Sequence, residues 1–324
     1  MPAPSTYLDY LNTTTRNRVV PFMVDQVSKT NTTFLTLNKN AIFLDGGDYI
    51  AQPILTGIPS QMVTSYTGTE IFPQNFQGNE QGAVFDWKFY GISIDISGPD
   101  EARNSGIAGL LNLLRIRMQT AEIAIRDRLG ADLQGDGTGN SGKNLVGWAA
   151  AIDDGNTVDD YGGVPRSAFH CWKAPVLGHG GVLRAFNTGL VDTGIQLAAL
   201  DSDAPNMFVT TPGIVTRLNQ AAMPIQRTER SDYTSYGFRN VGYRGYPVVG
   251  DQQVQTSPCE VLYGLNTRYI QLYYHRDRHF RWVPFQRQGN QDVVTGKILL
   301  ALCLIVSRPA SQFVITDLDS TLTA

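Results

Sequence analysis

Charged residues are scarce in this 324-residue chain: they make up 17% of it, whereas about a quarter is usual for a soluble globular domain. Lysine is scarcer still, because the chain has 20 arginines but only 6 lysines, and arginine is the cation that protein interfaces favour. Both deficits indicate a surface that is largely covered by neighbouring subunits. The net charge of −3 argues against tight nucleic-acid binding by the chain as a whole.

Cysteines and long apolar runs are also few. Cys171, Cys259 and Cys303 lie far apart, and their odd number without a CxxC pair argues against a disulfide framework or a zinc site. The most apolar run, 298–306, is too short to span a bilayer. The first residues lack the pattern of a secretory signal. We therefore expect a soluble protein that is made in a reducing cytoplasm and has no membrane partner.

Two short segments imitate catalytic motifs but are incomplete. Gly137–Lys143 has the GxxxxGK spacing of a phosphate-binding loop, yet Asn144 stands where Ser or Thr should bind Mg²⁺, and a helix rather than a strand is predicted before it. Asp317, Asp319 and Thr321 match the DxDxT nucleophile motif of haloacid-dehalogenase-like phosphatases, but too few residues follow to complete that site. We expect no catalytic, cofactor-binding or metal-binding residues. A phosphatase or nucleotide-binding enzyme is the alternative function.

The longest predicted element is a helix over 105–134, in which apolar residues recur at spacings of three and four. Ser105 can cap its N-terminus, and Gly135 can end it in a left-handed conformation. At 1.5 Å per residue the helix is about 40 Å long, which suggests the backbone of a flat, extended subunit. Shorter helices are predicted over 189–200 and 212–220, and strands over 49–55, 83–97, 207–211, 246–249, 260–274, 279–285 and 292–307. The strands 260–274 and 279–285 are expected to pair with each other around a turn.

A long polar stretch with isolated large apolar residues separates the first two predicted strands. Tyr66, Ile71, Phe72 and Phe76 stand there among Gly, Gln, Asn and Thr. A two-stranded projection cannot bury such side chains in its own interior. We predict that they dock on an adjacent subunit and that their ordering is coupled to assembly.

A second candidate contact surface lies around the turn at 276–278. Arg276, Arg278 and Arg281 are interleaved there with aromatic residues. Such a pattern can stack on nucleic acid, and it is equally typical of protein interfaces. Because the whole chain is acidic, the sequence favours subunit contact, with weak contact to DNA as the alternative.

The order of these parts resembles that of the major capsid proteins of tailed bacteriophages, the Hong Kong 97-like fold. No single group of residues is a signature, and the order and spacing of several groups along nearly the whole chain carry the resemblance. These groups are Gly46-Gly47 with Ile50 and Pro53, Ala83 with Trp87-Lys88, Ile94–Ser97 before Asn104-Ser105-Gly106, Gly135–Thr138, Val146-Gly147, Tyr161–Val164 and Gly245–Val248.

The resemblance implies an α+β fold with four parts. These are an N-terminal arm over 1–44, an extended β-hairpin loop (E-loop) over 45–98, a peripheral domain with the long helix as its spine over 99–135 and 288–324, and an α/β axial domain over 136–287. The implied function is that of a non-enzymatic head protein, which self-assembles into hexamers and pentamers of an icosahedral shell around double-stranded DNA.

The resemblance also implies partners and a location. The partners are other copies of the chain, a separate scaffolding protein, a portal protein and, where the shell carries one, a decoration protein. Packaged DNA is expected to be contacted weakly and non-specifically. The protein is expected in the virion capsid after assembly in the host bacterial cytoplasm. A different virion protein, such as a head decoration or tail component, is a second alternative function.

Overall fold

The computed structural model describes residues 32–57, 63, 65–69, 71, 80–103, 107–201, 203–222, 241–256, 258–287 and 289–322. The α-helices are α2 (Thr32–Asn38), α3 (Gly98–Arg103), α4 (Ile107–Gln134), α5 (Gly139–Gly142), α6 (Trp148–Ala151), α7 (Thr188–Ala198) and α8 (Pro212–Ala222). The 3-10 helices are η2 (His170–Trp172), η4 (Thr267–Tyr269), η5 (Arg276–Arg278) and η6 (Pro309–Ser311). The strands are β1 (Ile42–Leu44), β2 (Tyr49–Leu55), β3 (Glu80–Asp86), β4 (Lys88–Ser97), β5 (Asp160–Tyr161), β6 (Val164–Pro165), β7 (Val176–Leu177), β8 (Arg184–Ala185), β9 (Met207–Thr210), β10 (Val241–Tyr243), β11 (Tyr246–Gly250), β12 (Glu260–Leu265), β13 (Ile270–His275), β14 (Arg281–Arg287), β15 (Val293–Val306) and β16 (Phe313–Asp319).

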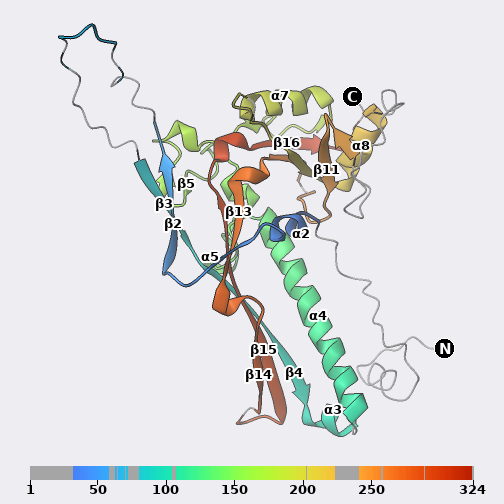
Figure 1. Ribbon diagram of the computed structural model, residues 1–324. Helices are drawn as coiled ribbons and strands as arrows, with labels where there is room; N and C mark the ends of the chain where they lie inside the picture. The colour runs from blue at the N-terminus through green and yellow to red at the C-terminus, as the bar shows by residue number, and fades with distance from the viewer. Residues whose placement is uncertain are drawn as a thin grey trace.

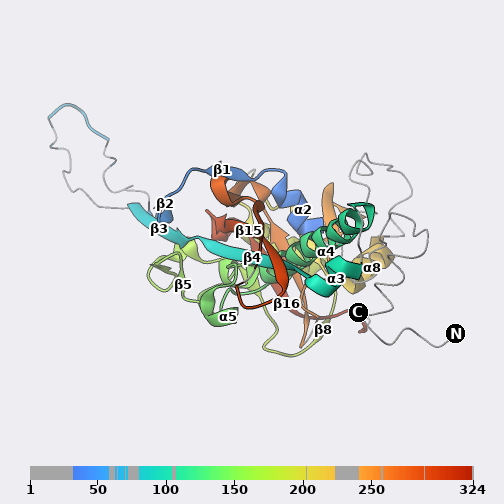
Figure 2. The ribbon, with the colours of Figure 1, turned by 90° about the horizontal axis from the view of Figure 1, so that it is seen from below.

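Three parts are visible in Figure 1. The long helix α4 lies beside a blade of strands in the lower part, and a second sheet with α7 and α8 forms the upper part. The hairpin of β2 and β3 projects to one side. Figure 2 shows the hairpin leaving the body on the side opposite to α8.

Strand β15 organises the lower sheet. Its 14 residues extend over about 46 Å, long enough to pair with β4 along one edge and with β14 and then β13 along the other. The expected pairing of 260–274 with 279–285 is therefore wrong. Asn266 interrupts the first of these segments, so that β12 enters the upper sheet while β13 pairs with β15.

Helix α4 has 28 residues and covers nearly all of the predicted range 105–134, while residues 104–106, including the expected cap Ser105, lie outside the described residues. Its buried side chains recur four or eight positions apart on the face toward the body. Among the described side chains, the buried apolar ones are Leu113, Ala121, Ile125, Leu129 and Leu133. Periodicity places Met118 on that apolar face, but it is partly exposed and borders an open groove between α4 and the sheet, with Phe280 and Trp282 opposite.

The upper sheet has the strand order β10-β11-β9-β12-β16-β7, with β8 also paired to β16. Helix α7 packs against β16 and α8 against β11. Phe313 lies so close to Gly194 and Gly264 that a Cβ at either glycine would come within 2.6 Å of its ring. Because β16 belongs to this sheet, residues 288–324 do not all pack beside the spine helix as predicted. Only β15 does so.

The hairpin begins as predicted with β2 over Tyr49–Leu55, which pairs in register with β3. The predicted single strand over 83–97 instead divides at Trp87, after which β4 joins β15. Trp87 is buried, and its indole Nε1 donates a hydrogen bond to the carbonyl of Gly47 at 3.0 Å. This contact holds both ends of the hairpin at the body of the subunit.

Candidate subunit interface

The two faces of the β2–β3 hairpin have different surroundings. One face is buried against the body through Ile50, Ile54, Ala83 and Phe85. The opposite face is exposed and partly apolar: Tyr49, Leu55 and Val84 leave 56%, 63% and 42% of their surface open, and the acidic Glu80 and Asp86 lie beside them on β3. Exposed apolar surface on a ribbon that has only two strands is typical of a protein-binding surface.

Two of the four apolar residues predicted to dock on a neighbour are described. Tyr66 is 63% exposed and Ile71 is 91% exposed. Phe72 and Phe76 lie outside the described residues. Tyr66 and Ile71 thus extend the exposed apolar character of the hairpin beyond its two strands.

The three predicted arginines lie at the waist of the molecule, near the end of β13 and the start of β14, away from the hairpin tip (Figure 1). Arg276 forms an ion pair with Asp45 at 2.7 Å, and both side chains are mostly exposed, so the pair adds little stability. Arg278 lies over the ring of Phe89, 5.6 Å from its centroid. Arg281 is exposed on β14. The structure therefore separates the arginines from the tip residues.

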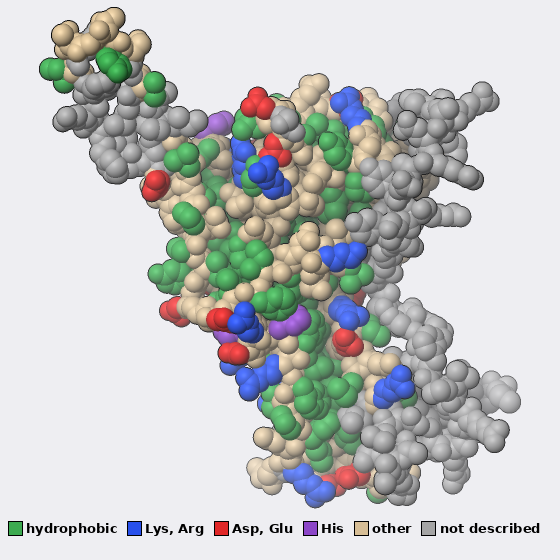
Figure 3. Space-filling model, in the orientation of Figure 1, with side chains coloured by type: hydrophobic (Ala, Val, Ile, Leu, Met, Phe, Trp, Pro, Cys, Tyr) green, Lys and Arg blue, Asp and Glu red, His purple; other side chains and the backbone are tan. Residues whose placement is uncertain are grey.

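Figure 3 shows where side-chain types gather on one face of the molecule. Apolar side chains form a band down the lower part, where the blade meets α4, and charged residues are scattered around its edges. The groove beside Met118 lies in this lower part, and its wall carries Arg115 and Glu122 together with the apolar residues. The low content of charged residues in the sequence thus appears on this face as a band of apolar surface over the lower part of the molecule.

The phosphate-loop imitation has a local structural role. It follows α4 rather than a strand, as the sequence predicts. The Asp136 carboxylate accepts hydrogen bonds from the backbone N–H and the hydroxyl of Thr138, and these bonds lower the pKa of Asp136. Asn140 and Ser141 have left-handed backbone conformations, which a helix opening after a phosphate loop would not contain.

The carboxylates of the DxDxT imitation likewise bind the chain itself. Asp317 accepts hydrogen bonds from the backbone N–H groups of His179 and Gly181, at 2.7 and 3.1 Å. Asp319 accepts from the hydroxyl and the N–H of Thr321, and these bonds lower the pKa of Asp319. Both aspartates hold turns of the backbone in place.

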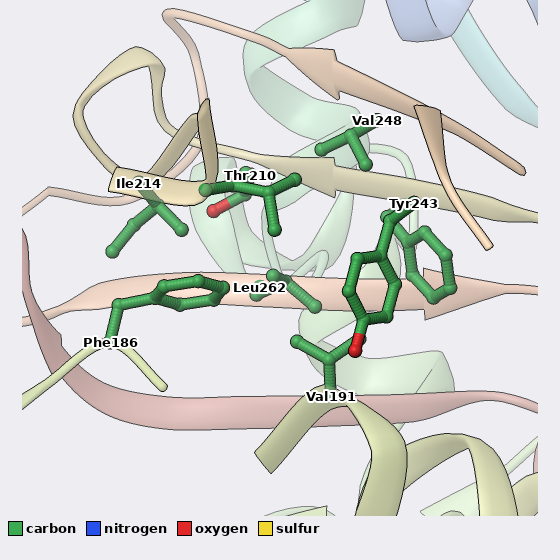
Figure 4. Close-up of a pocket in the computed structure, with 9 residues that line it drawn as sticks. Phe186, Val191, Thr210, Ile214, Tyr243, Val248 and Leu262 are labelled. Carbon is green, nitrogen blue, oxygen red and sulfur yellow. The ribbon is translucent and has the colours of Figure 1, made fainter. Parts of the chain in front are cut away.

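An apolar cavity lies in the upper part between the sheet and helices α7 and α8 (Figure 4). Its volume is about 10 Å³, so it has room for little more than one water-sized sphere. Such a cavity is a packing defect of the core, since small-molecule sites are far larger. Phe186, Val191 and Tyr243 converge on it from separate elements.

Three further findings concern the described part of the chain only. It contains no group of three or more His, Cys, Asp or Glu side chains placed to hold a metal ion. None of its helices is long and apolar enough to cross a membrane. Cys171, Cys259 and Cys303 are free thiols.

Several solved shell proteins share this arrangement of helices and strands. The capsid asymmetric unit of cyanophage A-1(L) has a TM-score of 0.71 and 15% identity, over 94% of this chain and 97% of that one. The holo-SrpI encapsulin complex from Synechococcus elongatus PCC 7942 has a TM-score of 0.63 and 8% identity, over 98% and 97%. The capsid of an empty GTA particle has a TM-score of 0.58 and 11% identity, over 94% and 95%. No protein-family profile and no curated protein sequence matches the chain.

The chain has the Hong Kong 97-like capsid fold. The fold class expected from the order of the sequence elements is thereby confirmed. Because the Hong Kong 97-like fold covers nearly the whole chain, the projecting β2–β3 hairpin and the long helix α4 are integral parts of it.

Sequence reasoning missed the exposed residues on the hairpin strands themselves. Tyr49 and Leu55 stand in β2, whose two faces both carry apolar residues, so alternation could not separate the inward from the outward side of that strand. The signal that could have identified these residues was the apolar character of both faces of β2. A half-buried strand normally alternates with polar residues, and its failure to do so indicates a second buried face.

Proposed function

We propose that this chain is the major capsid protein of a tailed bacteriophage, which assembles with copies of itself into the icosahedral head around double-stranded DNA. The observation that carries the proposal is the capsid fold over nearly the full length of both this chain and the phage and GTA subunits. The exposed apolar hairpin supports it, because a monomer would leave that surface in water.

The hairpin is the main contact in this proposal. Its outer face, with Tyr49, Leu55 and Val84, lies against the next copy, and Tyr66 and Ile71 extend that contact. The contact is heterologous, because the hairpin of one copy meets a different surface of the next copy. Repetition around a five-fold or six-fold axis then closes a ring. Stabilisation comes from many such interfaces rather than from one large interface.

The arginines between β13 and β14 form a second, weaker contact in this proposal. Arg276 and Arg278 already have partners within the subunit, in Asp45 and Phe89. Arg281 is exposed on the blade and is the residue we assign to a neighbouring copy or to weak, non-specific contact with packaged DNA. The acidic net charge limits how much DNA binding such a residue adds.

The division into parts follows the sheets. We assign α4 with the β15-centred sheet to the peripheral domain and the upper sheet with α7 and α8 to the axial domain. We assign residues 1–44 to the arm and the E-loop to 45–98; the arm's described end is anchored in the body, because Phe34 and Leu37 of α2 are in the core and β1 pairs with β13. The boundaries over 99–135 with 288–324 and over 136–287 shift accordingly, because β13 and β14 lie in the lower sheet and β16 in the upper one.

The proposed partners beyond other copies are a separate scaffolding protein, a portal protein and a decoration protein where the shell carries one. The proposed location is the virion, after assembly in the host bacterial cytoplasm. Non-enzymatic function fits the aspartates of the two imitation motifs, which bind backbone and hydroxyl groups of the chain.

A bacterial protein compartment is the second candidate function. The similarity to the SrpI encapsulin complex, over 98% of this chain, favours it specifically. The two functions differ in what the shell encloses, since a phage head holds DNA and a compartment holds protein. A head decoration protein, a tail protein or an enzyme would form no closed shells at all.

Electron microscopy of the purified full-length protein tests these functions. Closed icosahedral shells are expected. Treatment of shells from infected cells with nuclease, followed by nucleic-acid and protein analysis of the contents, separates a DNA-filled head from a protein-filled compartment. Rings or tubes would favour a tail component, and small discrete particles would contradict a shell function altogether.

A further inference from the structure

The β2–β3 hairpin has no strand partner in the described part of the chain other than itself. The direction in which it leaves the subunit must therefore be set by side-chain packing and isolated hydrogen bonds. Part of that packing is provided by residues 148–175, which we call the platform, beside contacts of β3 with β15. The platform contains α6, β5, β6 and η2.

The hairpin meets the platform at the tight turn between β5 and β6. Gly162 and Gly163 form this turn with φ of +66° and +74°, as a type I′ turn requires. The backbone N–H of Val84 donates a hydrogen bond to the carbonyl of Gly162 at 2.8 Å. A Cβ at Gly162 would lie 2.7 Å from Cζ of Phe85 and 3.2 Å from Cβ of Ala83. Strand β3 thus rests directly on the backbone of the turn.

The residue before the turn fastens the platform to the lower sheet. Tyr161 is buried, and its ring packs edge-on against Phe85 with centroids 5.1 Å apart. Its hydroxyl accepts a hydrogen bond from the backbone N–H of Val306, at the end of β15. Its carbonyl accepts a hydrogen bond from the indole of Trp172 at 2.9 Å. A movement of Tyr161 would therefore be transmitted both to the hairpin and to the long strand.

The platform is organised around a buried arginine that no carboxylate within the described residues pairs with at ion-pair distance. Arg166 is fully buried, and it donates hydrogen bonds to the carbonyls of Trp172, Val158, Ala150 and Ala151 at 2.6–3.1 Å. Burial lowers the pKa of its guanidinium. A buried cation is unfavourable unless all its donors are satisfied, so these four carbonyls must keep their positions.

A carboxylate supports the same loop from the other side. Asp153 is buried and accepts hydrogen bonds from the backbone N–H groups of Gly155, Thr157 and Val158. The guanidinium of Arg166 also lies over the ring of Tyr161, 5.3 Å from its centroid. One continuous network thus runs from the arginine through Tyr161 to the turn that touches β3.

We propose that the Gly162 turn, held in place by Arg166, is a positioning device that sets the direction of the hairpin and thereby the geometry of its contact with the next copy. This inference rests on the proposed shell function for its effect on assembly. The direction of the hairpin in the isolated subunit does not depend on that function. Gly162 and Arg166 act through the hairpin and need not touch the neighbouring copy.

Two adjacent glycines give a matched pair of variants. Gly162→Ala and Gly163→Ala both place a Cβ on a left-handed residue, so the backbone strain is similar. Only the Cβ at position 162 collides with Phe85, because the Cβ at position 163 would meet no atom within 4 Å. The pair therefore separates the strain of the turn from the displacement of the hairpin.

Hairpin direction is measured first, in isolated subunits. Nitroxide labels are placed at Leu55→Cys on β2 and Leu197→Cys on α7, both of which are exposed, in a background where Cys171 and Cys259 are serine. We expect Gly162→Ala to shift or broaden the distance distribution between the labels, and Gly163→Ala to leave it as in the parent. Equal distributions in both variants, or equal changes in both, would overturn the positioning role.

Assembly is measured second, with unlabelled full-length protein. We expect Gly162→Ala to lower the yield of closed shells about tenfold or more relative to Gly163→Ala, since the misdirected contact recurs in every subunit. Both isolated variants should remain folded, with Gly162→Ala melting at a lower temperature than Gly163→Ala because its Cβ collides with the buried ring of Phe85. Arg166→Met is expected to shift the label distance in the same direction, whereas an unshifted distance in folded protein would remove Arg166 from the device. Absence of shells from the parent would refute the proposed function, while the label distances would still decide the positioning role.

Discussion

The hairpin contact can be tested with two adjacent residues that lie on opposite faces of β2. Leu55 is 63% exposed on the outer face, whereas Ile54 is 9% exposed and belongs to the core. We consider Leu55→Ser and Ile54→Ser. Each change replaces an aliphatic side chain with a small polar one at almost the same place in the chain.

The expected size of the effect follows from the exposure of Leu55. Full burial of a leucine side chain contributes about 1.5–3 kcal/mol, and roughly two thirds of its surface is still open in the subunit, so docking contributes about 1–2 kcal/mol per contact. That free energy corresponds to an association constant that is about tenfold weaker for each hairpin. Ile54→Ser instead empties a buried site, which costs the subunit about 2–5 kcal/mol of folding stability.

Light scattering against protein concentration measures assembly, and thermal melting measures the stability of the isolated subunit. Leu55→Ser should raise the concentration at which shells appear by about tenfold while the melting temperature stays near that of the parent. Ile54→Ser should lower the melting temperature clearly. If Leu55→Ser assembles at the parental concentration, the outer face is not an interface. If it melts as early as Ile54→Ser, the outer face packs within the subunit instead.

Two further predictions concern the imitation motifs and the spine helix. Lys143→Ala and Asp317→Asn should leave shell yield and DNA content near those of the parent. Lys143 is exposed, and an asparagine oxygen at position 317 can still accept a backbone hydrogen bond. ATP or phosphate-ester hydrolysis that vanishes in either variant would refute the non-enzymatic assignment. Leu129→Asp, which puts a charge at a fully buried position of α4, should yield insoluble protein, whereas Ala131→Asp at an exposed position two residues later should yield soluble protein that melts normally. Equal solubility of these last two variants would show that the face of α4 is misassigned.

Local sequence patterns were sufficient to predict the extent of those elements that have a regular apolar pattern and clear ends. Helix α4 is long and has a repeating apolar face, so its extent was predictable from periodicity, as was β2 between its flanking turn residues. The phosphate-loop imitation could be rejected from the missing Ser or Thr at position 144 and from the helix predicted before it. The shortage of charge and of lysine predicted covered surface without saying where that surface lies.

Tertiary structure alone decided which strands pair and which residues position the hairpin. Alternation identifies a strand but not its sheet, so β12 and β13 looked like one strand and β16 looked like a neighbour of the spine. Arginine is usually exposed, and no local pattern sets Arg166 apart from the exposed arginines of the chain. Its role arises because four carbonyls from residues 150–172 converge on one guanidinium, and such convergence exists only once this segment has folded around the arginine.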